Sequence, residues 1–192
     1  MFELLHKKIN ETIDITDQDF EHVKTLFIPK KLRKKRFLLQ EGDPCVYTCF
    51  VERGLLRSFR IDEKGNEHIL QFGMQGWWIA DLYSFLTGVG SQYNIEALEE
   101  SELLLITKPS WDTLLNEVPA LERYFRILIQ NNLIATQNRL MRNMTISAEE
   151  RYTKLISEFP DISQRVPQHM IASYIGVTRE TLSRLRSQIS HQ

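Results

Sequence analysis

The sequence predicts an α+β protein in which a β-rich middle segment lies between two helical segments. Residues 1–27 place apolar side chains three or four positions apart, the spacing of a helix that buries one face. Residues 28–107 instead alternate short apolar runs with turn residues, which is typical of an antiparallel barrel or sandwich. Residues 108–192 return to helical spacing.

The composition is that of an ordinary folded protein. Of the 192 residues, 42% are hydrophobic and 26% are charged, which excludes a largely disordered chain. The formal net charge is −1, so affinity for nucleic acid must come from a local patch. No stretch approaches the roughly 20 apolar residues that span a bilayer, and the start lacks the features of a signal peptide. We therefore expect a cytoplasmic protein without a membrane partner.

Local signals mark a helix start before the middle segment and a turn within it. Thr16 before Asp17 and Asp19 predicts an N-cap for a second N-terminal helix. The turn residues Lys64–Asn66 predict a hairpin, because Gly and Asn accept a positive φ. The expected strands are 37–39, 46–51, 55–61, 68–72, 93–98 and 103–106.

A long helix should follow the β-rich segment. Pro119 suits the first turn of a helix that continues to about Met144. This helix has two apolar stripes, which could cover its own barrel and the same helix of a second copy, or form one broad core face. The first stripe is Ile127, Ile134 and Met141, and the second is Ile129, Leu133, Leu140 and Met144.

Another helix is expected to begin at a capping box, Ser147 to Glu150, in which each side chain satisfies the other's backbone N–H. Pro160 should end it, and residues 160–166 are expected to be a short polar connector.

The last 25 residues match a helix-turn-helix at each structural position. Gly176 permits a tight turn with positive φ, and Thr178 can cap the second helix. Ala172 is small enough for the second helix to cross closely. The other inward positions are Ile171, Ile175, Val177, Leu182 and Leu185.

The outward face of the second helix, residues 178–190, has the chemistry that reads base edges. Arg179, Glu180, Ser183 and Arg184 should lie on its exposed N-terminal side, where arginine can bond guanine and glutamate can accept from cytosine. The alternative is a solvated face of an ordinary helix. Contacts with the DNA backbone are expected from Gln168, His169, Thr178 and Arg186.

The segment Thr178–Arg184 resembles the recognition helix of the Crp/Fnr family of bacterial transcription regulators, named for the cyclic-AMP receptor protein and the fumarate-nitrate reduction regulator. Four upstream segments also resemble that family: Glu41–Pro44, Phe50–Gly54, Asp62–Gly65 and Gln75–Ile79. The similarity covers about residues 25–190.

The resemblance implies a homodimeric regulator that binds double-stranded DNA at a near-palindromic site, with RNA polymerase as a possible further partner. It divides the chain into a β-roll sensor domain with N-terminal helices (1–118), a dimerisation helix (119–145) and a helix-turn-helix domain (146–192). The chain ends six residues after Arg186, which predicts a truncated or absent wing.

The sequence departs from the family at the cassette that binds cyclic nucleotides. Where the family has Gly-Glu, this chain has Ala80 and Asp81. Where the family has Arg followed by Ser or Thr, it has Ser91 and Gln92. Because no Lys or Arg occurs from Gly73 to Glu102, a cyclic phosphate would lack its counter-charge. The effector is therefore not expected to be cyclic AMP; it is another small molecule or none.

The alternative function is a ligand-binding sensor module without a DNA role. Five aromatic residues near the cassette could line its pocket or belong to the core: Trp77, Trp78, Tyr83, Phe85 and Tyr93.

No cofactor, metal or catalytic residue is expected. Cys45 and Cys49 are two thiols, whereas an iron–sulfur cluster requires four ligands, so buried strand residues are expected instead. An enzyme on a cupin-like barrel would need clustered histidines, but only His68 lies in the β-rich segment.

One further feature is a basic run, Lys30–Arg36, with six positive charges in seven residues. It is either a solvated strand edge or a contact for DNA phosphate or an acidic face of RNA polymerase.

Overall fold

The computed structural model describes residues 1–189, which form two compact units. The barrel unit contains Met1–Arg60 and Gln71–Ile129. The helical unit contains Ile61–Leu70 together with the chain from Gln130 onward. A short piece of the β-rich segment therefore belongs to the helical unit. The predicted domain boundaries at 118 and 145 stay predictions.

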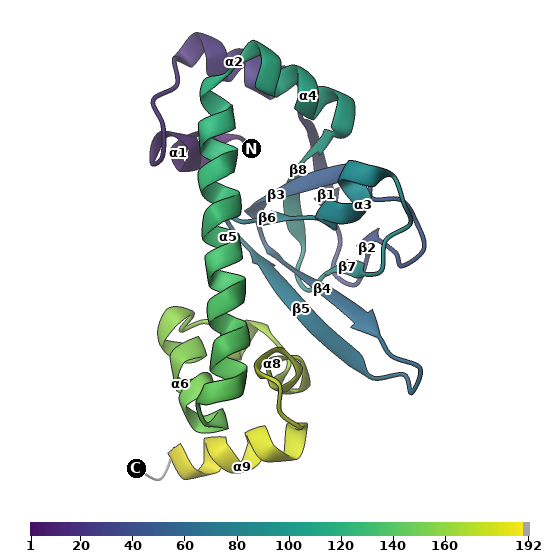
Figure 1. The fold of residues 1–192 in the computed structure, drawn as a ribbon, viewed down its shortest axis with the longest axis vertical. Coiled ribbons are helices and arrows are strands. Elements are labelled where there is room, and N and C mark those ends of the chain that lie inside the picture. Colours follow the sequence, from purple (N-terminus) through teal and green to yellow (C-terminus); the bar gives the residue numbers. More distant parts are fainter. Residues whose placement is uncertain (190–192) are drawn as a thin grey trace. The chain divides into compact units, whose positions relative to one another are not determined.

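The elements alternate as the sequence predicts, with helices at both ends of a β-rich segment (Figure 1). The helices are α1 (Glu3–Asn10), α2 (Asp17–Thr25), α3 (Leu82–Thr87), α4 (Lys108–Glu117), α5 (Ala120–Thr145), α6 (Ala148–Glu158), α7 (Ile162–Arg165), α8 (Gln168–Ile175) and α9 (Arg179–Ile189). The strands are β1 (Ile28–Leu32), β2 (Phe37–Leu39), β3 (Tyr47–Arg53), β4 (Leu55–Ile61), β5 (Glu67–Met74), β6 (Trp78–Ile79), β7 (Asn94–Ala97) and β8 (Ser101–Thr107).

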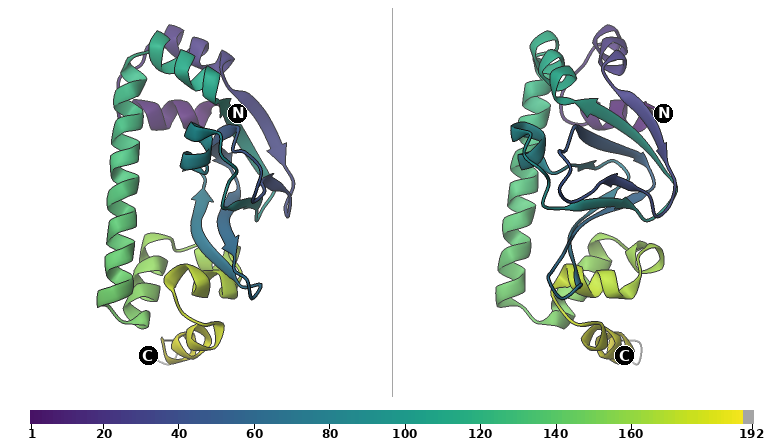
Figure 2. Two further views of the ribbon diagram at one scale, coloured as in Figure 1. Left: turned by 45° about the vertical axis from the view of Figure 1, so that its right-hand side comes forward. Right: turned by 90° about the vertical axis from the view of Figure 1, so that its right-hand side faces the viewer.

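The strands form two four-stranded sheets in the orders β1-β8-β3-β6 and β2-β7-β4-β5. Figure 2 shows these strands from two further directions, in purple-blue to teal. All six predicted strands are present, as β2–β5, β7 and β8. The sequence missed β1 and β6. In β1 only Leu32 is buried, so no alternation of apolar and polar residues marks it, and β6 has only two residues.

Aliphatic side chains fill the space enclosed by the strands. Val51 from β3, Ile95 from β7 and Leu103 from β8 are each at most 1% exposed and belong to one apolar cluster. Cys49 and Cys45 belong to the same cluster, in agreement with their expected burial. The core of the β-roll is therefore filled mainly by its own side chains.

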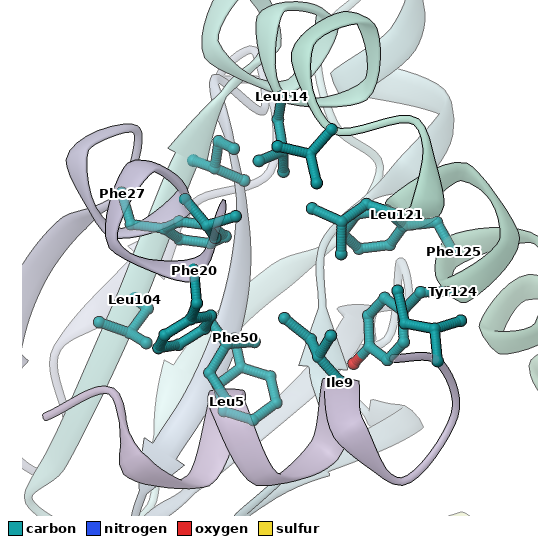
Figure 3. Packing of buried hydrophobic residues seen from close by; sticks show 14 residues of the cluster. Leu5, Ile9, Phe20, Phe27, Phe50, Leu104, Leu114, Leu121, Tyr124 and Phe125 are labelled. Atoms are coloured by element: carbon teal, nitrogen blue, oxygen red, sulfur yellow. The ribbon is translucent and has the colours of Figure 1, made fainter. Parts of the chain in front are cut away.

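A second core packs the helices against the other side of β3 and β8. Figure 3 shows Leu5 and Ile9 from α1 pointing toward Phe50 and Leu104 of the strands. Phe20, Phe27, Leu114, Leu121, Tyr124 and Phe125 surround them. The N-cap of α2 is confirmed, because the Asp19 N–H donates to the Thr16 hydroxyl over 3.1 Å.

Besides this packing, one carboxylate of the barrel bonds helix α1. Glu52 of β3 is 8% exposed and accepts the backbone N–H groups of Leu4 (2.8 Å) and Leu5 (3.2 Å). These N–H groups lie in the first turn of α1, where no partner within the helix is available. Glu52 thus caps a helix that lies 47 residues away along the chain.

Helix α5 begins after Pro119 and ends at Thr145, as the sequence predicts. Its first turns are anchored in the barrel unit, where Trp78 donates to the Tyr124 hydroxyl over 3.1 Å and Trp111 packs on Phe125 with ring centroids 4.1 Å apart. From Ile129 onward its large apolar side chains are between 47% and 73% exposed within the described chain: Ile129, Leu133, Ile134, Leu140, Met141 and Met144.

The expectation of a polar connector at 160–166 is wrong. This segment contains α7, and its apolar residues Ile162 and Val166 are only 2% and 3% exposed. The sequence did not reveal these two buried residues, because polar residues separate them and the segment is too short to show a helical period.

Candidate nucleic-acid interface

The predicted helix-turn-helix is present as α8 and α9. Gly176 ends α8 in the left-handed region at φ 73°, which a residue with a side chain adopts only with strain. The Val177 N–H then donates to the Ala172 carbonyl over 2.9 Å, which closes the turn.

Small and apolar side chains bring the two helices together. Ile171, Ala172 and Ile175 of α8 are at most 4% exposed, and Leu182 of α9 is fully buried. Leu185 is half-buried. The inward face of α9 is therefore fixed by packing, as predicted, and this determines which side chains face outward.

The opposite face of α9 presents the four predicted base-reading residues. Arg179, Glu180, Ser183 and Arg184 are all exposed, and their spacing places them on one side of the helix. We call these four residues the reading face. Thr178 caps the helix by accepting the Thr181 N–H over 3.2 Å. The described helix ends at Ile189, so Ser190 of the predicted helix lies outside the described residues.

The residues predicted to contact the DNA backbone lie at helix starts or along α9. Gln168 and His169 are exposed in the first turn of α8, and Thr178 is exposed at the cap of α9. Arg186 is half-buried. Backbone N–H groups at a helix start favour an anion, and Gln168, His169 and Thr178 lie at two such starts.

Glu180 is held in its ionised form. Its own backbone N–H, the Thr178 hydroxyl and the nearby Arg179 and Arg184 lower the pKa of its carboxyl below the usual 4.5. At neutral pH this side chain is therefore an acceptor only. The reading face thus offers two guanidinium donors, one carboxylate acceptor and one hydroxyl.

Helix α8 is fixed by bonds that the sequence did not predict. The Ser173 hydroxyl donates to the Glu67 carbonyl and accepts the Ile69 N–H, both at 2.9 Å. Ser173 thus ties α8 to β5, which is the last strand of its sheet. Arg139 of α5 donates to the Leu70 carbonyl and lies 4.9 Å from the ring centre of Tyr174.

The cassette residues lie together in the barrel unit, and they satisfy one another. Asp81 is 4% exposed and accepts the Ser91 hydroxyl at 2.8 Å, the Ser84 N–H at 3.1 Å and the Gln92 N–H at 3.4 Å. Its carboxylate therefore caps α3 and holds the following loop. Ala80 is half-buried and Gln92 is exposed.

The five aromatic residues near the cassette divide between core and surface. Phe85 is buried and packs near Trp111, and Trp78 is half-buried among aromatic rings. Tyr83 is 64% exposed and Trp77 is 36% exposed. Phe85 and Trp78 therefore pack with the core, whereas Tyr83 and Trp77 reach the surface.

Burial also makes the two cysteines poor ligands. Desolvation raises the pKa of the Cys45 and Cys49 thiols, which keeps both protonated at neutral pH. Within residues 1–189 no group of three or more His, Cys, Asp or Glu side chains could hold a metal ion. In the same residues, none of the helices is both apolar and long enough to span a bilayer.

Residues 29–118 match the model of the cyclic nucleotide-binding domain. The fumarate and nitrate reduction regulatory protein of Vibrio cholerae is 28% identical over 191 residues, which cover 92% of this chain and 72% of that protein. Electron transport regulator A of Shewanella oneidensis is 26% identical over 170 residues, which cover 81% of this chain and 66% of that protein. The chain thus spans about two thirds of the length of these relatives.

Two solved structures share the fold. FixK2 from Bradyrhizobium japonicum aligns with a TM-score of 0.74 at 20% identity, covering 86% of this chain and 85% of that one. The c-di-GMP-responsive global regulator CLP of Xanthomonas campestris aligns with a TM-score of 0.72 at 15% identity, covering 92% of each chain.

The two sheets form a barrel of the cyclic nucleotide-binding type, and the long helix leads to a C-terminal helix-turn-helix. The chain is similar in sequence to transcription regulators of the Crp/Fnr family, and its residues 29–118 match the cyclic nucleotide-binding domain.

Proposed function

We propose that this protein is a homodimeric, sequence-specific DNA-binding regulator that reads base pairs with the reading face of α9. The observation that carries the proposal is the simultaneous exposure of Arg179, Glu180, Ser183 and Arg184 on a helix whose other side is buried. Such a helix fits the major groove with its N-terminal residues at the base edges.

The chemistry of the reading face suits specific base pairs. Arg179 and Arg184 can each bond guanine O6 and N7, and Glu180 can accept the amino group of cytosine. Ser183 can donate or accept. Gln168, His169, Thr178 and Arg186 would then contact phosphate and set the position of α9 on the duplex. Since none of these side chains breaks or forms a covalent bond in this role, the proposal requires no enzyme activity.

We further propose that a second copy of the chain covers the exposed stripe of α5. Leu133 and Leu140 lie seven residues apart and are each 56% exposed, which is the repeat of a two-helix seam. A symmetric pair would present two copies of α9, and a near-palindromic site matches that symmetry. RNA polymerase is a further partner only by the resemblance.

The closed cassette supports an effector other than cyclic AMP, or none. The Asp81 carboxylate already has hydrogen-bond partners within the chain, and Ser91 stands where the family places an arginine. A pure ligand-binding role gains no support from this arrangement. The proposed site of action is the cytoplasm, where bacterial DNA lies.

Selection from randomised duplex DNA tests the proposed function. Wild-type protein should enrich two half-sites with inverted sequence, separated centre to centre by about one helical turn, roughly 10 base pairs. The matched variant with Arg179→Ala and Arg184→Ala should enrich no common sequence. Enrichment of the same site by both proteins, or of none by the wild type, would contradict the proposal.

A second experiment tests the dimer. Leu133→Asp with Leu140→Asp should give a monomer in sedimentation equilibrium and weaken binding to the selected site, because charges cannot be buried in the seam. The control pair Leu82→Asp with Leu86→Asp changes leucines on α3 that are 46% and 54% exposed. The control should remain dimeric. Dimers of equal stability in both variants would overturn the assignment of α5.

A further inference from the structure

The basic run forms an exposed surface of the barrel unit. It begins on β1 and continues through the turn that leads to β2. All six cationic side chains are exposed, and we call them the basic patch: Lys30, Lys31, Arg33, Lys34, Lys35 and Arg36. Among the described residues only Lys31 pairs with an acid, Glu102 at 3.5 Å, and Lys31 remains 70% exposed.

The turn that presents these cations is held rigidly. The Lys35 N–H donates to the Ala97 carbonyl at 2.7 Å, and the Ala97 N–H donates to the Arg36 carbonyl at 3.0 Å. Lys35 adopts φ 63° and, within residues 1–189, is the one residue other than glycine with a positive φ. A left-handed backbone conformation is energetically unfavourable for lysine, because its Cβ atom is crowded, but not for glycine.

The patch therefore combines two unfavourable features, backbone strain and repulsion between like charges. One ion pair, between Lys31 and Glu102, reduces the repulsion among these side chains. An anion that binds from outside would offset it, because opposite charges on a fixed surface attract without further ordering of the backbone.

The charge of the rest of the chain indicates what such an anion would contribute. The chain outside the patch has 18 Lys and Arg residues and 25 Asp and Glu residues, which gives it a net charge of −7. The helical unit, which bears α9, has nine Lys and Arg residues and eight Asp and Glu residues, a net charge of +1. Within these 192 residues the basic patch is thus the main concentration of positive charge available to a polyanion.

We propose that the basic patch binds the phosphate backbone of DNA outside the base pairs that α9 reads. The inference rests on the proposed DNA-binding function and adds to it a second, sequence-independent contact. Duplex DNA carries about one charge per 1.7 Å, which suits a row of cations without a fixed geometry. Four of the six cations are lysines, which are depleted at protein interfaces, so DNA fits the patch better than an acidic protein.

The salt dependence of binding provides the test. The patch variant is Lys30→Gln, Lys34→Gln and Lys35→Gln. The control variant removes the same charge from three exposed or ion-paired lysines on helices of the barrel unit, Lys7→Gln, Lys24→Gln and Lys108→Gln. Affinity for a selected site extended by about two helical turns on each side is measured from about 50 to 200 mM salt.

The patch variant should lower the slope of log K against log salt by up to about 2.7, because each lost phosphate contact removes about 0.9. Its preference for the selected site over a scrambled site should remain that of the wild type. The control should keep the wild-type slope. A Lys→Arg version of the patch variant should also keep it, and equal melting temperatures show that all variants are folded.

The outcomes separate this inference from the proposed function. If wild-type protein fails to prefer any DNA sequence, the proposed function fails. If wild-type protein binds specifically but the patch variant keeps the full slope, the patch does not contact phosphate and the inference is overturned. The inference would also be overturned if the patch variant lost binding to an acidic protein while its salt slope for DNA stayed that of the wild type.

Discussion

The cassette in the barrel unit and the reading face of α9 are both rich in polar side chains, but their hydrogen bonds differ. Asp81 is buried, and its carboxylate accepts three hydrogen bonds from its own chain. Arg179 and Arg184 are exposed on one face. A site that completes its own hydrogen bonds serves stability, whereas an open face of donors and acceptors is suited to a partner.

The contrast separates two uses of the same fold. In the barrel unit, the polar groups of the cassette hold α3 and its following loop together. In the helical unit, packing and backbone bonds hold α8 and α9, and the side chains of the reading face stay exposed. This difference predicts opposite consequences for substitutions at the two places.

The largest predicted effect is the difference in the free energy of unfolding between Asp81→Ala and Glu180→Ala. Removing the buried Asp81 carboxylate leaves the Ser91 hydroxyl and two backbone N–H groups without an acceptor. We expect the free energy of unfolding to fall by about 2–4 kcal/mol. Glu180→Ala on the exposed face should change it by less than about 0.5 kcal/mol. Denaturant titration measures both, and equal losses would remove the distinction between the two sites.

A smaller loss is expected from Ser173→Ala, which removes both bonds between α8 and the edge of β5. Two hydrogen bonds of ordinary strength correspond to about 1–2 kcal/mol of stability. The control is Ser157→Ala, because the Ser157 hydroxyl bonds only the Lys154 carbonyl of its own helix. Thermal unfolding of the two variants should differ. Identical melting temperatures would show that the β5 contact does not fix α8.

The pH dependence of DNA binding gives a subtler test of the reading face. The pKa of Glu180 is lowered, so its carboxylate stays ionised as pH falls from 8 to about 5. The affinity ratio between wild type and Glu180→Gln should therefore stay constant over this range and decline only below pH 4.5. Anisotropy titrations of both proteins measure the ratio. If the affinity ratio declined already near neutral pH, a group other than the Glu180 carboxylate would control this contact with DNA.

The smallest effect should be that of cyclic AMP on the barrel unit. A ligand present at 100 times its dissociation constant stabilises a protein by about 2.7 kcal/mol, which is easily seen as a rise in melting temperature. Because Asp81 and Ser91 already bond each other and no cation lies nearby in the sequence, we expect no rise. A clear, saturable shift would show that the cassette opens to a nucleotide.

The features predicted from the sequence are those that depend on neighbouring residues. The capping box is confirmed, with the Ser147 N–H bonded to the Glu150 carboxylate at 2.9 Å and the Glu150 N–H to the Ser147 hydroxyl at 3.2 Å. Gly176 and Thr178 bound the turn of the helix pair as expected. Each of these signals lies within four residues, where backbone geometry fixes which groups meet.

The features that the sequence could not predict join distant residues. Ser173 and Glu67 lie 106 residues apart, and Glu52 lies 47 residues from the N–H of Leu5. No local period marks such pairs, because the fold alone brings them together. Asp81 also belongs here, since the resemblance placed it among ligand-binding residues while the structure gives it Ser91 as a partner.

The most direct test of the central claim measures Arg184→Ala on the selected site and on every single base-pair variant of one half-site. We predict that Arg184→Ala weakens binding to the selected site by about 1–3 kcal/mol and relaxes the preference at one base pair of the half-site. Binding to random DNA should change far less. An equal loss on selected and random DNA would show that α9 contacts only the backbone, and the account would be wrong.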